Sequence, residues 1–385
     1  MNGKKSQYLD IFILIVSMSL LSLHFSVGLA GTLFPIRKLN VSKFSMLIPI
    51  ILLLMFKISM SIILPLGQYS TFKFNYIFLI RECATIVLFY TWFIIGLYIY
   101  NFSFFSSLKW TSVIITLLFV PIIQIDLQGA PIMAAIDASQ AIFFLLIFVV
   151  FFEKNRSIYL KLLTLSILLA TSFTLASSFT TICGLMLLFL FFIQSTFISR
   201  IMVPWRITVV VAIAFLTFAS TFAASVNLKD NVNSRGNNGE TREALAGYAL
   251  SIICDFPIFG TPMGRGIIPT RVVEELGWTQ YSDPDVAQVI AETYGFQSFD
   301  IYALSFHNGF LYLLTRFGLF SFLLFYLIIR EVPRSAPLSL VLFSIVMLLS
   351  ISANVVIESI RSGPGVALVL GALFSFQKKP QVAPH

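Results

Sequence analysis

The segment from Ser305 to Arg330 joins a His-Asn pair to a long apolar run, and histidine is the side chain best suited to move a proton near neutral pH. His307 is one of only three histidines in the chain. If Ser305 is the N-cap of a helix, His307 lies in its first turn, where the helix dipole favours the neutral imidazole that can accept a proton. We therefore predict His307 as a general base for a hydroxyl group, with Asn308 as a substrate contact. The alternative is an interfacial histidine that only caps the helix or forms a hydrogen bond.

Helical spacing separates the polar residues of this segment. At about 100° per residue, Gly318 and Ser321 fall close to the face of His307, and small residues there allow another helix to approach. Arg316 falls about 180° from His307, and we expect it to be structural or to extend toward the membrane surface. The sequence therefore predicts that His307 faces a helix bundle and that Arg316 points away from it.

Several arginines have neighbours that suit anion binding. Arg265 lies in the turn-rich segment GTPMGRG, where main-chain amides and a guanidinium could together hold a phosphate. Arg242 is in line with the apolar face of an amphipathic helix predicted over residues 240–255. For both, the alternative is a solvated charge. Arg81 opens an apolar run beside Glu82, so it is either functional or paired with that carboxylate.

Glu358 is a candidate partner for the histidine. It precedes a Gly-Pro-Gly turn and could orient His307 as a carboxylate does in a catalytic dyad, or it could pair with Arg361 at i,i+3 spacing. No carboxylate pair or DxD-like motif suggests a metal site, and the three cysteines form no CxxC motif. We predict neither a metal nor a cofactor.

Composition places all of these residues in a membrane protein. The chain of 385 residues is 58% hydrophobic and 11% charged, with a mean hydropathy of +0.93. Its apolar runs are about 20 residues long, which is the length that crosses a bilayer as a helix. The net charge of +8 is interpreted as a topology signal, and no nucleic-acid partner is predicted. The expected fold is therefore all-α and polytopic.

Eleven membrane spans are predicted, and a twelfth near the start of the chain is the alternative. The chain is expected to contain three parts: N-terminal helices over 1–226, a large loop with short helices over 227–306, and three closing helices over 307–385. The predicted spans are 9–31, 44–66, 76–100, 110–127, 131–152, 157–175, 179–199, 205–226, 307–330, 336–356 and 361–377.

The distribution of Lys and Arg predicts the orientation. These residues are concentrated in the connections that share a side with the C-terminus, so the positive-inside rule makes that side cytoplasmic. The large loop over 227–306 then lies outside the cytoplasmic membrane. With eleven spans the N-terminus also lies outside despite Lys4 and Lys5, and a twelfth span would remove this conflict.

Two segments resemble the signatures of the bacterial O-antigen ligase and O-antigen polymerase superfamily. His307-Asn308, nine residues, and then Gly318-Leu-Phe-Ser321 resemble the HN-x9-GxxG signature of that family. Arg242 and the later stretch Phe256-Pro-Ile-Phe-Gly-Thr-Pro-Met-Gly264 resemble its "R … PLFGxGxG" segment. The resemblance covers roughly residues 240–325. Ser321 replaces a glycine, and the stretch 175–184 lacks the Ser-Arg pair found in many members.

The resemblance implies an enzyme that performs an inverting, metal-independent glycosyl transfer. The donor would be a glycan on undecaprenyl diphosphate, and the acceptor would be another lipid-linked repeat unit for a polymerase or lipid A-core for a ligase. Membrane lipid and a chain-length regulator are further implied partners. The predicted catalytic residues are His307, Arg265 and Arg242, and the predicted substrate-binding residues are Arg81, Asn308 and Glu358.

The sequence therefore favours an O-antigen polymerase in the bacterial inner membrane, with its active site facing the periplasm. A ligase is the close alternative. A transporter of lipid-linked sugars is the alternative from another class, and it would place charges along a pathway in mid-membrane helices. The ionisable residues considered above are instead expected at the outer surface and in the large loop.

Overall fold

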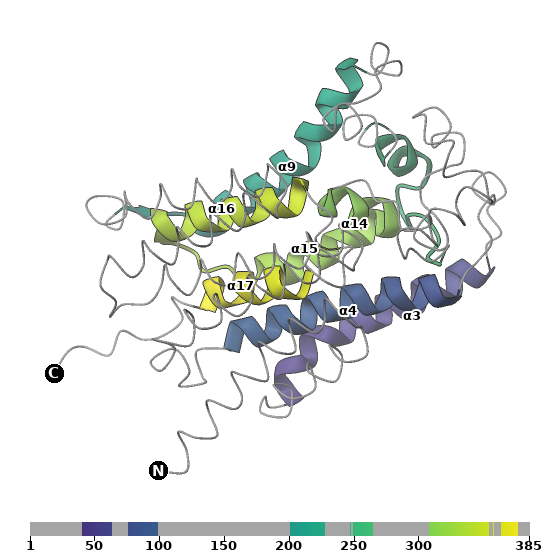
Figure 1. Cartoon of the computed structure of the whole chain (residues 1–385), viewed down its shortest axis with the longest axis horizontal. Helices are drawn as coiled ribbons and strands as arrows, with labels where there is room; N and C mark the ends of the chain where they lie inside the picture. The colour runs from purple at the N-terminus through teal and green to yellow at the C-terminus, as the bar shows by residue number, and fades with distance from the viewer. Residues whose placement is uncertain are drawn as a thin grey trace, which may run out of the picture.

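The computed structural model describes residues 41–63, 76–98, 201–227, 247, 249–264, 308–353, 357 and 363–375. These residues are mostly helical (Figure 1). Three of the described helical stretches are long and apolar enough to cross a bilayer, namely Phe44–Ile62, Phe78–Tyr98 and Gly309–Ile329. The chain is therefore a helical membrane protein. The number of spans and the large loop stay predictions.

The helices follow the predicted apolar runs closely. Six of the eleven predicted spans fall on described residues, and the spans 9–31, 110–127, 131–152, 157–175 and 179–199 lie outside them. The described elements are η1 (Val41–Met46), α3 (Leu47–Ile63), α4 (Tyr76–Tyr98), β1 (Met202–Val203), α9 (Trp205–Asn227), α14 (Gly309–Phe317), η8 (Gly318–Phe320), α15 (Ser321–Ile329), β2 (Ala336–Pro337), α16 (Leu338–Ala353) and α17 (Gly363–Ser375).

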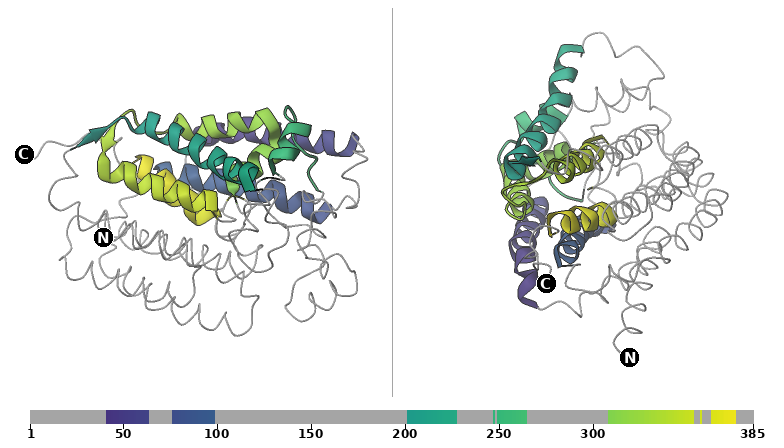
Figure 2. Two further views of the ribbon diagram at one scale, coloured as in Figure 1. Left: turned by 90° about the horizontal axis from the view of Figure 1, so that it is seen from above. Right: turned by 90° about the vertical axis from the view of Figure 1, so that its left-hand side faces the viewer.

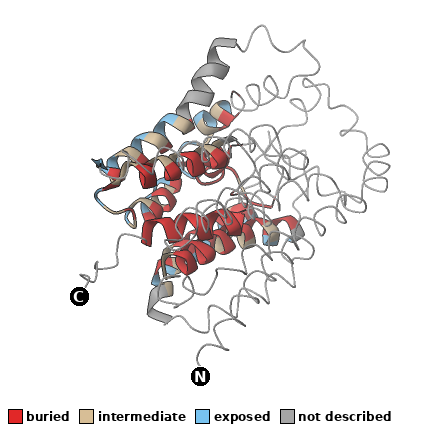
Figure 3. Ribbon diagram, turned by 60° about the vertical axis from the view of Figure 1, so that its left-hand side comes forward, coloured by how far each residue is buried: buried red, intermediate tan, exposed pale blue. Residues whose placement is uncertain are grey.

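Small residues bring α4 and α17 into main-chain contact. A Cβ atom on Gly96 would overlap the carbonyl oxygen of Leu368, and a Cβ atom on Gly371 would overlap that of Phe93. Both helices are largely buried (Figure 3). Close packing of small residues replaces the hydrophobic effect as the force that joins helices in lipid. Glycine at both positions therefore lets the main chains of α4 and α17 touch.

A pair of two-residue strands lies just before the starts of α9 and α16. Met202 pairs with Pro337 and Val203 pairs with Ala336 in antiparallel register. This pair is a small addition to a fold whose described residues are otherwise mostly helical, as the all-α prediction requires. The pair aligns the starts of two neighbouring helices, which lie side by side in Figure 2. The indole of Trp205 donates to the Ser344 hydroxyl at 2.9 Å and fastens them together.

Helix α9 has one buried and one exposed face. Val209 and Ile213 are buried, whereas Ile207, Val211 and Phe215 are at least 60% exposed. Exposed large apolar side chains at helical spacing are expected to contact lipid in a membrane protein. The exposed side of α3 has the same character, with Leu52, Met55 and Ile62 pointing outward.

The predicted span 307–330 agrees with the candidate span Gly309–Ile329, but its helix breaks in the middle. Gly318 has φ 54° and ψ −134°, and the chain forms a 3-10 turn before α15 begins at Ser321. Only glycine adopts this backbone conformation readily. The angle of 100° per residue therefore does not hold across the break. Residues before Gly318 and Ser321 after it cannot be assigned to one helix face by this spacing.

Candidate functional site

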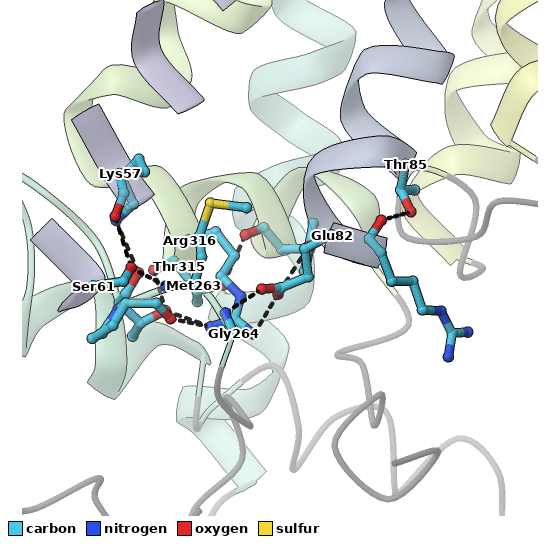
Figure 4. A network of polar contacts seen from close by, with 12 residues as sticks. Lys57, Ser61, Glu82, Thr85, Met263, Gly264, Thr315 and Arg316 are labelled. Carbon is cyan, nitrogen blue, oxygen red and sulfur yellow. Dashed lines mark hydrogen bonds and ion pairs between the residues drawn. The ribbon is translucent and has the colours of Figure 1, made fainter. Parts of the chain in front are cut away.

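The turn at residues 256–264 lies against three helices and forms the centre of the site (Figure 4). It follows a helix whose described residues, 247 and 249–255, agree with the predicted helix over 240–255. Ala249 and Ile252 are buried, as their predicted apolar face requires. The 256–264 turn therefore begins where an amphipathic helix ends and then enters the bundle.

Two glycines allow the turn and the broken helix to touch through their main chains. A Cβ atom on Gly260 would stand 2.5 Å from the carbonyl carbon and oxygen of Arg316. A Cβ atom on Gly318 would stand 2.6 Å from the carbonyl oxygens of Pro257 and Ile258. Both glycines have positive φ, and so does Gly264. Any side chain at Gly260 or Gly318 would separate the two segments.

The break in the helix and the turn satisfy each other's hydrogen bonds. In a continuous helix the amide of Leu319 would donate to the carbonyl of Thr315. It donates instead to the carbonyls of Pro257 and Ile258, at 2.9 and 3.1 Å. The carbonyl of Thr315 accepts from Thr261, at 2.7 Å from its amide and 3.1 Å from its hydroxyl. Irregular backbone at membrane depth is tolerated where protein groups bond it in this way.

Helix α3 holds the turn with a buried lysine. The Lys57 ammonium donates to the carbonyls of Phe259 at 2.6 Å and Thr261 at 2.9 Å, and it lies 5.8 Å from the ring centroid of Phe317. One helical turn later, the Ser61 hydroxyl accepts from the amide of Met263 at 2.7 Å. Lys57 is 1% exposed, so these contacts replace its hydration.

Glu82 of α4 connects the turn to α14. One of its carboxylate oxygens accepts from the amide of Gly264 at 2.8 Å. The other lies 2.5 Å from Nη2 of Arg316 and 3.4 Å from the hydroxyl of Tyr312, which donates to it. Arg316 also donates through Nη1 to the carbonyl of Pro262 at 2.6 Å. The carboxylate thus bonds from α4 to two segments that are far apart in sequence, the 256–264 turn and α14.

The prediction that Arg316 points away from the bundle and extends toward the surface is wrong, because its side chain pairs with Glu82 between buried segments. Its side chain is 1% exposed, and that of Glu82 is 4% exposed. Lys57, Glu82 and Arg316 all lie inside candidate spans. The expectation that the ionisable residues considered above lie at the outer surface is therefore wrong for Glu82 and Arg316, and Lys57 adds a third buried charge that it did not include. Charges at such positions are costly and persist when they pair or bind main-chain carbonyls.

Arg81 and Asn308 are the predicted site residues that the structure describes. Arg81 is half-buried in α4, next to Glu82, and its carbonyl accepts from the Thr85 hydroxyl at 2.7 Å. Asn308 is the N-cap of α14, and its side-chain oxygen accepts from the amides of Phe310 at 3.0 Å and Leu311 at 3.1 Å. A substrate contact through Asn308 stays a prediction.

The expected N-cap at Ser305 is wrong, because α14 begins at Gly309 and Asn308 caps it. His307 therefore precedes the first turn in the chain. His307, Arg265, Arg242 and Glu358 lie outside the described residues, so their roles stay predictions.

The segments that carry three of the predicted residues meet at Glu82. Arg81 is its neighbour in α4, Gly264 immediately precedes Arg265, and Tyr312 lies one helical turn beyond Asn308. The two segments that resemble family signatures also contact each other directly, through Thr261 and Thr315. Among the described residues, the structure therefore brings α4, the 256–264 turn and α14 into contact.

Lys57, Ser61 and Glu82 were not predicted as functional. Lys57 is the only charged residue in the predicted span 44–66, and an ionisable residue inside an apolar run is itself a signal. Glu82 was considered only as a partner for Arg81, and its described ion pair is with Arg316. Within the described ranges, no cluster of three or more His, Cys, Asp or Glu residues could hold a metal ion.

No family model, curated protein or solved structure matches the chain.

Proposed function

We propose that the protein is a periplasm-facing, metal-independent glycosyltransferase that polymerises oligosaccharide repeat units linked to undecaprenyl diphosphate. The observation that supports this proposal is the convergence at Glu82. Its carboxylate bonds to Gly264, which precedes Arg265 in the chain, and to Tyr312 of α14, the helix that follows His307 and Asn308 in the chain. A set of basic residues together with a proton acceptor would suit attack on a sugar diphosphate.

The reaction assigns one role to the histidine and another to the arginines. His307 takes the proton of the acceptor hydroxyl while its oxygen attacks the anomeric carbon of the donor. The bond from that carbon to the diphosphate oxygen breaks, and the configuration inverts. Arg265, Arg242 and Arg81 stabilise the negative charge of the departing lipid diphosphate. A ligase would use the same steps with lipid A-core as the acceptor.

Removal of the base or the diphosphate contact is expected to abolish glycan chain growth. In a strain that lacks the wild-type gene, His307→Ala and Arg265→Ala should each lower polymerisation by about 10²–10⁴-fold, the usual contribution of a general base or a positioned donor. Lipopolysaccharide gels measure glycan chain length, and the amount of each variant in the membrane shows whether it still inserts. His385→Ala and Arg334→Ala are matched controls, because Arg334 is exposed and His385 follows the predicted span 361–377 in the sequence.

The banding pattern of the deletion strain distinguishes the related activities. Single-repeat bands indicate a polymerase, whereas bare core with accumulated lipid-linked polymer indicates a ligase. Wild-type glycan in the His307→Ala strain would contradict the assignment of His307 as the base.

A transporter of lipid-linked sugars is the second candidate, and the structure supplies a specific reason to consider it. Broken helices and buried charges at membrane depth are typical of transporters. Both occur here, at Gly318 and at Lys57, Glu82 and Arg316. In the deletion strain, unprocessed repeat units that stay on the cytoplasmic side would favour transport over polymerisation.

A further inference from the structure

Helix α3 forms hydrogen bonds to the 256–264 turn through two side chains on one face. Lys57 and Ser61 are four residues apart, so they are neighbours on the helix surface. Together they bond to the carbonyls of Phe259 and Thr261 and to the amide of Met263. These hydrogen bonds therefore hold the turn as far as Met263, two residues before Arg265.

The contacts with the turn and with Phe317 are the described interactions that account for a buried lysine at position 57. The residues around it in α3 are apolar or hydroxyl-bearing, and a lysine at this depth is costly unless strong acceptors surround its ammonium group. The two carbonyls at 2.6 and 2.9 Å and the face of Phe317 supply that environment. An aliphatic side chain would fill the space without holding the turn.

We propose that Lys57 is a positioning residue for Arg265. Its ammonium group fixes the carbonyls of Phe259 and Thr261, and this sets the position of the turn up to Gly264, the residue before Arg265. The role of Arg265 in this inference rests on the proposed function. The fixed position of the turn does not, so the two can be tested separately.

Cysteine labelling tests the position of the turn without any assay of activity. Met263 is fully buried, so a cysteine introduced by Met263→Cys into a chain without its native cysteines should be protected from a small water-soluble maleimide. In membranes, Lys57→Met should raise the labelling rate by about tenfold or more, because the population of the locally open state rises exponentially as the free energy of local opening falls. Unchanged protection would overturn the proposal.

Two further substitutions at the same position make the test specific. Lys57→Arg keeps a cation that can donate to both carbonyls, and it should return the labelling rate to within about threefold of the parent. Lys57→Gln is neutral and shorter by one bond, so it keeps a polar donor but cannot reach both carbonyls. Protection of the cysteine in Lys57→Gln, like protection in Lys57→Met, would contradict the positioning role.

Arg206→Met is the matched control. Arg206 also donates to main-chain carbonyls, those of Val332 at 2.8 Å and Arg330 at 3.1 Å, but it holds a different turn. Its loss should leave the labelling rate at position 263 unchanged. An equal rise in both variants would show general loosening of the fold and would overturn the specific role of Lys57.

Glycan gels of the same variants connect the turn to activity. Lys57→Met should lose long glycan chains and Lys57→Arg should recover them, with membrane levels of both proteins equal. Long chains in Lys57→Met together with an exposed turn would overturn the positioning role. If the wild-type chain makes no polymer while the labelling results hold, the proposed function fails and the fixed position of the turn stands.

Discussion

Replacement of Glu82 by alanine is expected to lower the apparent free energy of unfolding by about 3–5 kcal/mol, the usual cost of breaking a buried ion pair from one side. The carboxylate pairs with Arg316 at 2.5 Å and accepts from the amide of Gly264. Its loss leaves a guanidinium that is 1% exposed without its charged partner and frees the end of the 256–264 turn. Unfolding of the purified protein in mixed micelles measures the change.

Two comparisons separate this effect from a general sensitivity to lost charge. Glu331→Ala removes an ion pair in which Glu331 is 20% and Arg330 is 40% exposed. This substitution should lower the free energy of unfolding by less than about 1 kcal/mol. Joint replacement of Glu82 and Arg316 by leucine should recover part of the lost free energy of unfolding, because neither charge of the pair is then left buried without the other. Equal stability of Glu82→Ala and the wild type would contradict the central position of Glu82.

Gly318→Ala is the substitution for which we expect the second large effect. The backbone at Gly318 has φ 54° and ψ −134°, a conformation that costs other residues about 1–3 kcal/mol. The added Cβ would also stand 2.6 Å from two carbonyl oxygens of the 256–264 turn. Either the turn moves away or the helix break changes shape, so stability and glycan polymerisation should fall together.

Gly309→Ala is the matched control within the same helix. A Cβ atom there would stand 3.1–3.2 Å from the ends of the Ile351 and Ile357 side chains, which can shift, and its φ lies outside the positive region. Its effect on the free energy of unfolding should stay within about 1 kcal/mol. If Gly318→Ala is as well tolerated as Gly309→Ala in mixed-micelle unfolding, the contact between the turn and the helix break does not support the fold.

The sequence predicts the helices well because the bilayer limits their length. The predicted spans 76–100 and 205–226 agree with α4 and α9 to within two residues at each end. Predicted span 44–66 likewise agrees with α3 to within three residues. An apolar run of about 20 residues has few alternatives in a membrane protein, because its main chain must satisfy its own hydrogen bonds in lipid.

The helix break could not be predicted from the same pattern. Gly318 lies in an apolar run, and glycine there is equally consistent with close helix packing in a regular helix. The choice between them depends on the carbonyls of Pro257 and Ile258, which arrive from more than fifty residues earlier in the chain. Local spacing carries no information about such a partner.

The role of Glu82 was hidden for a similar reason. Its neighbour Arg81 offered a local partner, whereas its ion pair with Arg316 and its bond to Gly264 join positions that are far apart in sequence. A single carboxylate inside an apolar run signals that some partner exists, but it does not identify the partner. The contacts that assemble the candidate site are therefore known only from the fold.

Glycan polymerisation by the purified protein tests the proposed function most directly. The wild-type chain in nanodiscs, given lipid-linked repeat units extracted from its source organism and an excess of chelator, should form longer lipid-linked glycans and release undecaprenyl diphosphate. His307→Ala and Glu82→Ala should leave the single units intact under the same conditions. Wild-type protein that releases no lipid diphosphate, yet moves intact units across the bilayer of sealed vesicles, would contradict a glycosyltransferase and establish a transporter.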